Sequence, residues 1–503
     1  MVVLENFASL RQFVPEIVLA GAALAVFILD LVWGAKRRRI YPWIGVGGLV
    51  LAGIFSLEAL RPATGLAARD FYFFEGLLAF DGLTQLFRLF FALVGVLTLI
   101  MVTRSRELKE TGGEFTAILL IVILGMNLMA QSANLLMAYL AMETVSMLSY
   151  TLVGSLRGNR RSHEAGLKYV IYGGIASGAM LYGFSWLYGA TGTLDIPRIA
   201  ASLQEGQMAP LTLFIALSFI LVGLGFKMAS APFHMWCPDV YEGAPVAVTA
   251  FLSVGPKAAG FALTMRLLYG VLAVPAAGHW TAVRDLPWPM VLAVISVATM
   301  LIGNLSALWQ NNLKRLMAYS SIAHAGYLLM GLVVLSSAGL TAIVFYLFAY
   351  LLMNFGAFMI IAAVADESGT EDIEGIRGLW KRHPFLAVMM GVFLFSLTGL
   401  PPAFGFIGKF YLFAALIEGG WIWLAVIGLL NSVISLAYYM RIGKVMLIDG
   451  TETGTGETPI RTAPMKAPLL VSSVVGALAG LTLLFGVYWE PIRVFAERTF
   501  RLI

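Results

Sequence analysis

The stretch 398-TGLPPAFGFIGKF-410 interrupts an apolar run that extends from residue 384 to residue 416. Proline lacks a backbone N–H and clashes with the preceding helical turn, so the two adjacent prolines break any helix at this point. A second stretch, 226-FKMASAPFHMW-236, ends another apolar run with a proline. In a bilayer, the backbone groups freed at such breaks must face protein or water. Each break also carries one lysine, Lys227 or Lys409.

The composition places these breaks in a membrane protein. The chain has 503 residues, of which 60% are hydrophobic and 12% charged, whereas soluble domains carry roughly 25% charged residues. Its apolar runs have the length of about 20 residues that a helix needs to cross a bilayer, and a β-barrel would instead show alternating segments of about ten residues. We therefore predict an all-α polytopic membrane protein in contact with lipid. The net charge of +5 is spread over short loops, and we expect no nucleic-acid partner.

The apolar runs predict about fourteen transmembrane helices, of which the seventh and the twelfth are broken. The predicted helices fall near residues 13–33, 41–60, 82–102, 115–131, 133–154, 165–190, 211–231, 246–274, 288–308, 315–335, 338–364, 384–416, 419–441 and 467–488.

The basic residues predict which way the helices run. The loops that follow odd-numbered helices hold more than twice as many Lys and Arg residues as the other loops and both tails together. Cytoplasmic loops carry this excess. We therefore expect a multi-pass protein of the bacterial inner (plasma) membrane with both termini in the periplasm. The first apolar run is long and is followed by four basic residues, which indicates a retained helix rather than a signal peptide.

The two broken helices lie five helices apart, and an odd offset inverts the second unit relative to the first. Inverted repeats with interrupted helices at matching positions are typical of ion-translocating transporters. We therefore expect two inverted five-helix repeats, at residues 111–275 and 285–445. An N-terminal three-helix segment, 1–110, precedes them, and a cytoplasmic loop with the last transmembrane helix, 446–503, follows them.

Four charged residues lie inside segments that are otherwise apolar enough to span a bilayer: Glu143, Lys227, Lys257 and Lys409. A charge in hydrocarbon is costly, and such residues usually face a bundle interior and mark ion or proton pathways. Burial disfavours the charged form of an amine, which makes a buried lysine a workable proton carrier near neutral pH. The alternatives are a structural carboxylate and lysines whose amines reach the membrane interface. We interpret the four residues as parts of a proton relay.

Two further residues are candidates for this relay. His324 lies well inside an apolar span beside two serines and a tyrosine, and histidine exchanges protons near neutral pH. A hydrogen-bonded core histidine is the alternative interpretation. Lys168 lies near the predicted cytoplasmic end of its helix. Its amine could reach the interface, or it could pair with Glu164, four residues earlier.

The sequence carries no recognisable redox or metal motif. Its one cysteine, Cys237, cannot form a disulfide within the chain, and the five histidines lack metal-binding spacing. The segment 405-GFIGK-409 resembles a phosphate loop only superficially, because alanine stands where the first glycine belongs and phenylalanine follows the lysine. We therefore expect no redox cofactor and no metal on this chain.

Five stretches together resemble one known protein family. They are 138-AYLAMETVSMLSYTLVG-154, 164-EAGLKYVIYGGIASG-178, 225-GFKMASAPFHMWCPDVYEGAP-245, 313-LKRLMAYSSIAHAGYLLMG-331 and 397-LTGLPPAFGFIGKFYLF-413. The resemblance runs from about residue 80 to residue 445, and it is to the antiporter-like membrane subunits of proton-pumping NADH:quinone oxidoreductase, or respiratory complex I. A lysine at position 409 and an end after the last predicted helix favour the N-type subunits over the M-type and L-type subunits.

This resemblance implies a fold of fourteen helices with two inverted repeats, and a role as one proton channel of the membrane arm. It implies that six residues occupy family positions: Glu143, Lys227, Lys257, Lys409, Lys168 and His324. We further expect Glu143 to pair with Lys227 and to couple this subunit to its neighbour. The parent complex is expected to use FMN, iron–sulfur clusters, NADH and quinone on other subunits. Neighbouring antiporter-like and small membrane subunits are the expected partners.

Other functions fit the same buried charges. A multi-subunit sodium/proton antiporter shares the fold without NADH dehydrogenase partners, and so does a related membrane-bound hydrogenase or ferredoxin-dependent complex. A purely structural membrane spacer would tolerate, or even gain stability from, neutralisation of the buried charges. Our prediction is a proton-translocating subunit that is driven by quinone reduction in other subunits.

Overall fold

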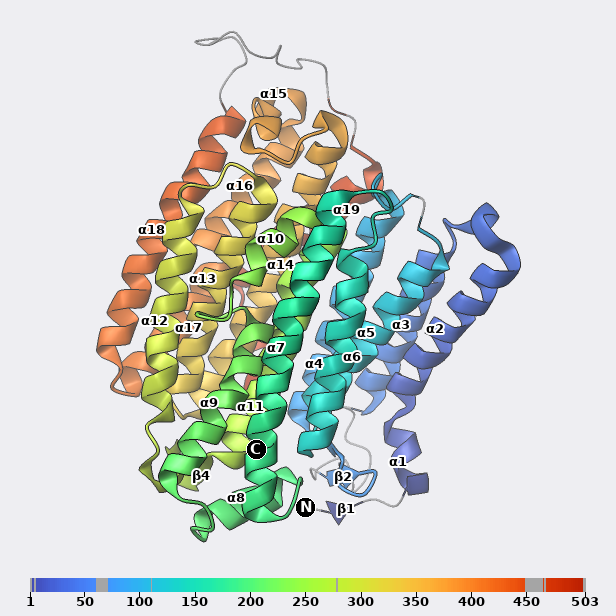
Figure 1. The fold of residues 1–503 in the computed structure, drawn as a ribbon. Helices are drawn as coiled ribbons and strands as arrows, with labels where there is room; N and C mark the ends of the chain where they lie inside the picture. Colours follow the sequence, from blue (N-terminus) through green and yellow to red (C-terminus); the bar gives the residue numbers. More distant parts are fainter. Residues whose placement is uncertain are drawn as a thin grey trace.

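The computed structural model describes residues 2–3, 6–59, 71–109, 111–276, 279–447, 465 and 467–500. It is a bundle of long helices that run side by side (Figure 1). The long helices are α2 (Val14–Trp33), α3 (Tyr41–Ala59), α4 (Gly82–Arg104), α5 (Gly113–Gln131), α6 (Leu135–Val153), α7 (Arg160–Thr191), α9 (Pro210–Met228), α11 (Val246–Val271), α12 (Trp288–Ala307), α13 (Leu313–Val333), α14 (Ser337–Ser368), α16 (Pro384–Thr398), α17 (Phe404–Glu418), α18 (Ile422–Leu447) and α19 (Leu469–Val487).

Shorter elements connect or flank these helices. They are α1 (Asn6–Gln12), α8 (Ile196–Gln204), α10 (Trp236–Gly243), α15 (Leu379–Arg382), α20 (Glu490–Phe500), and the 3₁₀ helices η1 (Gly34–Arg37), η2 (Val283–Asp285) and η3 (Ile373–Ile376). The strands are β1 (Val2–Val3), β2 (Phe71–Phe73), β3 (Leu78–Phe80), β4 (Ala273–Ala276) and β5 (His279–Ala282). β1 pairs parallel with β2, β2 pairs antiparallel with β3, and β4 and β5 form an antiparallel hairpin.

Each predicted transmembrane segment coincides with a helix, so an all-α polytopic membrane protein is confirmed. Among the described residues, twelve helices are long and apolar enough to cross a membrane. The shorter apolar helices α3 and α16 account for the two further segments, and α16 continues beyond a break as α17. The count of fourteen and the inverted repeats stay predictions.

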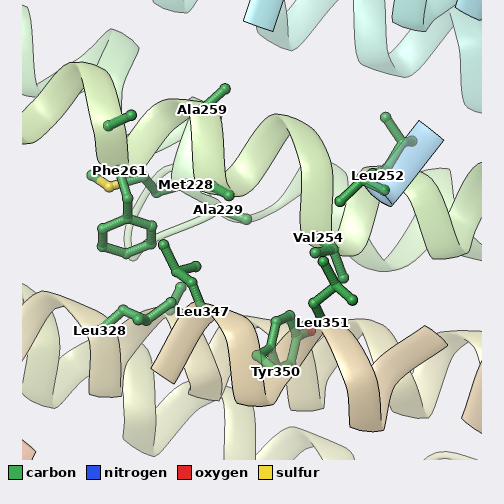
Figure 2. Close-up of a cluster of buried hydrophobic side chains, with 14 of the residues drawn as sticks. Met228, Ala229, Leu252, Val254, Ala259, Phe261, Leu328, Leu347, Tyr350 and Leu351 are labelled. Carbon is green, nitrogen blue, oxygen red and sulfur yellow. The ribbon is translucent and has the colours of Figure 1, made fainter. Parts of the chain in front are cut away.

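Three helices form the centre of the bundle. α11 is buried on all sides, and α13 and α14 nearly so, whereas α2 and α19 bury only about a quarter of their residues. A helix that is apolar all round belongs in such a core. Figure 2 shows how Met228 and Phe261, on one side, meet Leu328 and Leu347 on the other. The polar side chains carried by α11 and α13 are therefore surrounded by protein rather than lipid.

Both predicted breaks are present. α9 ends at Met228, before α10, and α16 ends at Thr398, before α17. Each helix is terminated by a residue in the left-handed region, Ala229 (φ 56°) and Gly399 (φ 86°). Glycine adopts this conformation without a steric cost, and at position 399 a side chain would also collide with Lys409, since a Cβ atom there would lie 2.8 Å from its Cδ.

The loops gather at two ends of the bundle. β1 lies at the end opposite to α15 (Figure 1). The connection after α2, which contains the basic run of η1, lies at the α15 end (Figure 1). By the distribution of basic residues, the α15 end is the predicted cytoplasmic end. Most of the predicted loop 446–466 lies outside the described residues.

Candidate site of buried titratable groups

Lys227 lies near the end of α9, just before the first break. Its side chain is 3% exposed, and its Nζ donates a hydrogen bond of 2.9 Å to Ser146 Oγ on α6. Its stem packs against Gly260 of α11, where an added Cβ would lie 3.2 Å from Lys227 Cγ. The first break therefore places this amine between α6 and α11, inside the bundle, and not at the interface.

Glu143 occupies the same helix as Ser146, about one turn away. Glu143 and Lys227 do not form the predicted ion pair within the described residues. The Glu143 carboxylate still acts electrostatically on the Lys227 amine. The Lys227 amine donates its hydrogen bond to the Ser146 hydroxyl instead. Glu143 Oε1 is buried without a hydrogen-bond partner. The neighbouring side chains of Leu140 and Met147 are 51% and 62% exposed, so Glu143 borders the outer surface of the bundle.

Lys257 lies in the middle of α11, directly after Pro256. Its side chain is 2% exposed, and its Nζ donates 2.7 Å to the carbonyl of Ser321 on α13 and also contacts the hydroxyl of that serine. Lys227 packs on Gly260 of the same helix, and so reaches α11 within about one turn of Lys257. The two amines belong to one buried region.

His324 forms the middle of a hydroxyl cluster on α13, α14 and α18. Its Nδ1 lies 2.6 Å from Tyr346 OH and its Nε2 lies 3.2 Å from Tyr439 OH. Tyr439 OH in turn lies 2.5 Å from Ser320 Oγ. The imidazole is 2% exposed. Both of its ring nitrogens contact hydroxyls that can accept or donate a proton.

Lys409 lies on α17, immediately after the second break. Its Nζ donates 3.3 Å to Leu397 O, 2.9 Å to Thr398 O and 3.1 Å to Ser432 Oγ. In an unbroken helix those two carbonyls would accept from residues 401 and 402, but both are prolines without N–H groups. The break therefore creates the acceptors that hold the buried amine, and the prolines and the lysine form one structural unit.

A row of polar groups runs from Lys257 to Lys409. Ser321, which holds Lys257, is followed on α13 by His324 and Tyr327 at helical spacing, and Ser320 adjoins it. The ring of Tyr327 lies 5.9 Å from that of His324 and 4.4 Å from Lys409 Nζ. Ser432 Oγ donates 3.3 Å to Tyr327 OH. Amines, hydroxyls and an imidazole in this order can pass protons, with water bridging the steps longer than a hydrogen bond.

Lys168 does not join this row. Its Nζ lies 2.8 Å from Glu164 and 2.7 Å from Asp239, and its side chain is 39% exposed. The predicted pair with Glu164 is present. Arg315 completes the network with bonds of 2.6 Å to Asp239 and 2.9 Å to Glu242. Burial alone would raise the pKa of Asp239, but hydrogen bonds from Lys168 and Arg315 hold that pKa below its usual value.

The sequence analysis missed a buried ion pair in the N-terminal helices. Glu16 of α2 is fully buried and accepts hydrogen bonds of 2.8 Å from Nε and from a terminal nitrogen of Arg88. Gln131 donates 2.7 Å to the same carboxylate. Arg88 itself gave the signal, since a charge within an apolar span requires a partner. A second arginine, Arg266, pairs with Asp81 at 2.8 Å.

The comparisons with known proteins agree with this arrangement. A family model described as NADH:quinone oxidoreductase/Mrp antiporter, TM, matches residues 132–435. NADH-quinone oxidoreductase subunit N 2 of Sorangium cellulosum (strain So ce56) is 47% identical over 99% of both chains. The chain belongs to the subunit N family of NADH-quinone oxidoreductases. Subunit N of Anaeromyxobacter sp. (strain Fw109-5) is 44% identical over 99% of this chain and 98% of its own length.

Solved structures extend the subunit N assignment to the fold. A chain of respiratory complex I from Thermus thermophilus covers 96% of this chain with a TM-score of 0.78 and 31% identity. A chain of the Mrp complex from Dietzia sp. DQ12-45-1b has a TM-score of 0.82 at 21% identity, which shows a shared fold alone. The resemblance to the N-type branch is thus confirmed. Among the described residues, no group of three His, Cys, Asp or Glu side chains is placed to hold a metal.

Proposed function

We propose that this chain is a proton-translocating membrane-arm subunit of an NADH:quinone oxidoreductase in a bacterial inner membrane. Membership of the subunit N family supports the parent complex. The observation that supports proton movement is the set of four buried groups, Lys227, Lys257, His324 and Lys409, each of which contacts a serine or tyrosine hydroxyl. Buried titratable groups without an adjacent counter-ion are expensive in a membrane and are retained where they carry ions.

Each buried group has a proposed role. Lys227 and Lys257 accept protons that come from the cytoplasm. His324 and its tyrosines pass them along α13. Lys409 releases them towards the periplasm. The break before it supplies the carbonyls that hold the amine until it loses its proton.

Glu143 is the proposed link to a neighbouring subunit. It borders the outer surface of α6 and its Oε1 lacks a partner within the described part of this chain. A donor from an adjacent membrane subunit would draw this charge away from Lys227, and so let the amine lose its proton more readily. Lys168, with its surface ion pairs, is proposed to steady the cytoplasmic end of α7 rather than to carry protons.

Electron transfer is assigned to other subunits. FMN, iron–sulfur clusters, NADH and quinone are proposed to act elsewhere in the parent complex, and their reaction drives this chain by long-range coupling. We also propose that both termini face the periplasm, and that the two inverted repeats span residues 111–275 and 285–445 between the 1–110 and 446–503 segments. The Mrp complex chain shares the fold at 21% identity, whereas a curated subunit N is 47% identical.

Proton pumping by inside-out membrane vesicles tests this function. Lys227→Ala and Lys409→Ala are expected to lower the number of protons moved per NADH oxidised to the level that the other subunits sustain. Lys444→Ala, at an exposed position near the end of α18, is the matched control and is expected to pump normally. Full pumping by both buried-lysine variants, in complexes that assemble normally, would show the proton-relay function to be wrong.

A further inference from the structure

A crevice opens between α4, α14 and the start of α19. Its volume is about 380 Å³, which lies in the range of ligand pockets in proteins. Arg382 of α15 pairs at 2.9 Å with Glu367 in the wall of the crevice. The crevice therefore lies at the α15 end of the bundle, the predicted cytoplasmic end, where the ends of transmembrane helices stand at the level of the lipid headgroups.

The wall of the crevice changes from charged to apolar with distance from the helix ends. On α4, Arg104 lies about one turn nearer the end of the helix than Ile100, and on α14, Glu367 lies about one turn nearer the end than Ala363. Val471 of α19 continues the apolar wall. A small soluble anion would leave this apolar wall unfilled. The crevice instead matches a ligand with a charged end and a hydrocarbon end, and a phospholipid is the membrane component with that chemistry.

The acidic side chains in the wall already have cationic neighbours. Glu367 accepts a hydrogen bond of 2.9 Å from Arg382. Arg106 donates 2.7 Å to the backbone carbonyl of Asp366, and the charges of Arg106 and Lys109 act on the Asp366 carboxylate. The two carboxylates therefore do not give the crevice a negative charge that would repel an anionic ligand.

Arg104 supplies the charge that such a ligand would meet. It is exposed, it lies in the last turn of α4, and its guanidinium forms no hydrogen bond or ion pair with the described part of the chain. A guanidinium binds phosphate oxygens through two parallel N–H donors. Basic pockets between transmembrane helices on the cytoplasmic side are typical sites for anionic headgroups. A lipid with a net negative charge is favoured, because the ammonium of a zwitterionic headgroup would be repelled by Arg104 and Arg106.

The chain closes the other end of the seam between α4 and α14 with its own helix. α20 packs against both α4 and α14. It follows directly after the far end of α19, and so begins at the predicted periplasmic end. The crevice is the counterpart of this position at the predicted cytoplasmic end, where lipid surrounds the helices.

We propose that this crevice is a binding site for an anionic phospholipid. Arg104 holds the phosphate, Arg106 is the second cation, and the acyl chains lie between α4, α14 and α19. The bound lipid thereby joins the N-terminal helices, through α4, to the central helix α14 and to the last transmembrane helix. The site uses none of the buried titratable groups of the proposed relay, and it does not depend on proton translocation.

Photolabelling of the assembled complex tests the site. The complex is placed in phosphatidylcholine nanodiscs with a phosphatidylglycerol probe that carries a photoreactive group in its acyl chain, and the labelled residues are identified by mass spectrometry. Label is expected on the apolar wall, at residues such as Ile100, Met359 or Val471, and inorganic phosphate is expected not to compete.

Two arginine variants show whether the headgroup is recognised. Arg104→Gln is expected to lower the labelling about fivefold, the effect of one basic residue beside an anionic lipid. Arg160→Gln, at an exposed position where α7 begins at the same end of the bundle, is the matched control and is expected to be labelled normally. Equal labelling of Arg104→Gln and the unchanged chain would overturn the site. So would displacement of the probe by inorganic phosphate, or equal labelling by a phosphatidylcholine probe.

Two tryptophan variants test whether the acyl chains enter the crevice. Val471→Trp fills the apolar wall and keeps both arginines, so label on α4 and α14 is expected to disappear. Ala477→Trp, at an exposed position further along α19, is the control of equal bulk and is expected to be labelled like the unchanged chain. Label that persists on α4 and α14 in Val471→Trp would overturn the site. Arg104→Gln, a substitution at an exposed position, decides the question if Val471→Trp does not assemble.

Discussion

At the scale of single residues, each of the three buried lysines in the proposed relay is held by a partner from another helix. Lys227 uses a serine of α6, Lys257 a serine of α13, and Lys409 the carbonyls freed by two prolines. The sequence predicted which residues are buried, because a charge inside an apolar run is visible in one dimension. It could not predict their partners, since helices far apart in the chain supply them.

The Glu16–Arg88 pair makes a sharp stability prediction. Arg88→Ala leaves a buried carboxylate without its cation, which costs roughly 3–5 kcal/mol, and the free energy of unfolding is expected to fall by that order. Glu114→Gln, in an exposed pair with Arg157, is the matched control and is expected to change stability by at most about 1 kcal/mol. To compare the two variants, the purified complex is heated and the fraction of this chain that stays in the complex is measured at each temperature. Equal stability of the two variants would refute a structural role for Glu16.

The Asp239 network predicts a pH dependence. Its hydrogen bonds hold the pKa of Asp239 below the value of the unfolded chain, which is about 3.9. The network therefore stabilises the fold fully above that pH, and its contribution is lost as the pH falls through the lower, folded value. The difference in thermal stability between the unchanged chain and Asp239→Asn is expected to be constant from pH 7 to pH 5 and to shrink below about pH 4. A difference that shrinks already at pH 6 would contradict this assignment.

At the scale of elements, hydropathy located the helices but not their ends. α7 begins at Arg160 rather than near residue 165, because Asn159 caps it by accepting from the backbone of Arg161 and Ser162. α18 extends to Leu447, beyond the predicted end at 441. A basic residue near a helix end looks like a loop residue in a hydropathy profile, whereas its long side chain lets the helix continue to the interface.

The second break depends on close packing between its two half-helices. A Cβ atom added at Gly405 would lie 2.0 Å from the backbone oxygen of Ser396, whereas one added at Gly391 would meet nothing within 4 Å. Gly405→Ala is therefore expected to separate α16 from α17 at a cost of about 1–3 kcal/mol. The amount of this chain recovered in the assembled complex is expected to drop for Gly405→Ala and to stay normal for Gly391→Ala. Equal recovery would show that the break tolerates separation.

At the scale of the whole molecule, the breaks and the central helices act together. α11, α13 and α14 are almost entirely buried, so the polar groups they carry can face one another across the middle of the bundle. The sequence did not indicate which helices form this core, but helix breaks and polar residues in apolar spans predicted Lys227, Lys257, His324 and Lys409 as candidate relay residues. Tyr346 and Tyr439 escaped prediction, because a tyrosine in an apolar helix is ordinary until its neighbours are known.

The most direct test of the account is a map of the assembled complex at a resolution that shows ordered water. The account predicts water in the spaces between Lys227 and Lys257, and between His324 and Lys409, so that a continuous chain of hydrogen bonds joins the three amines. Apolar side chains that fill those spaces without water, with the amines turned outward to the lipid, would contradict it.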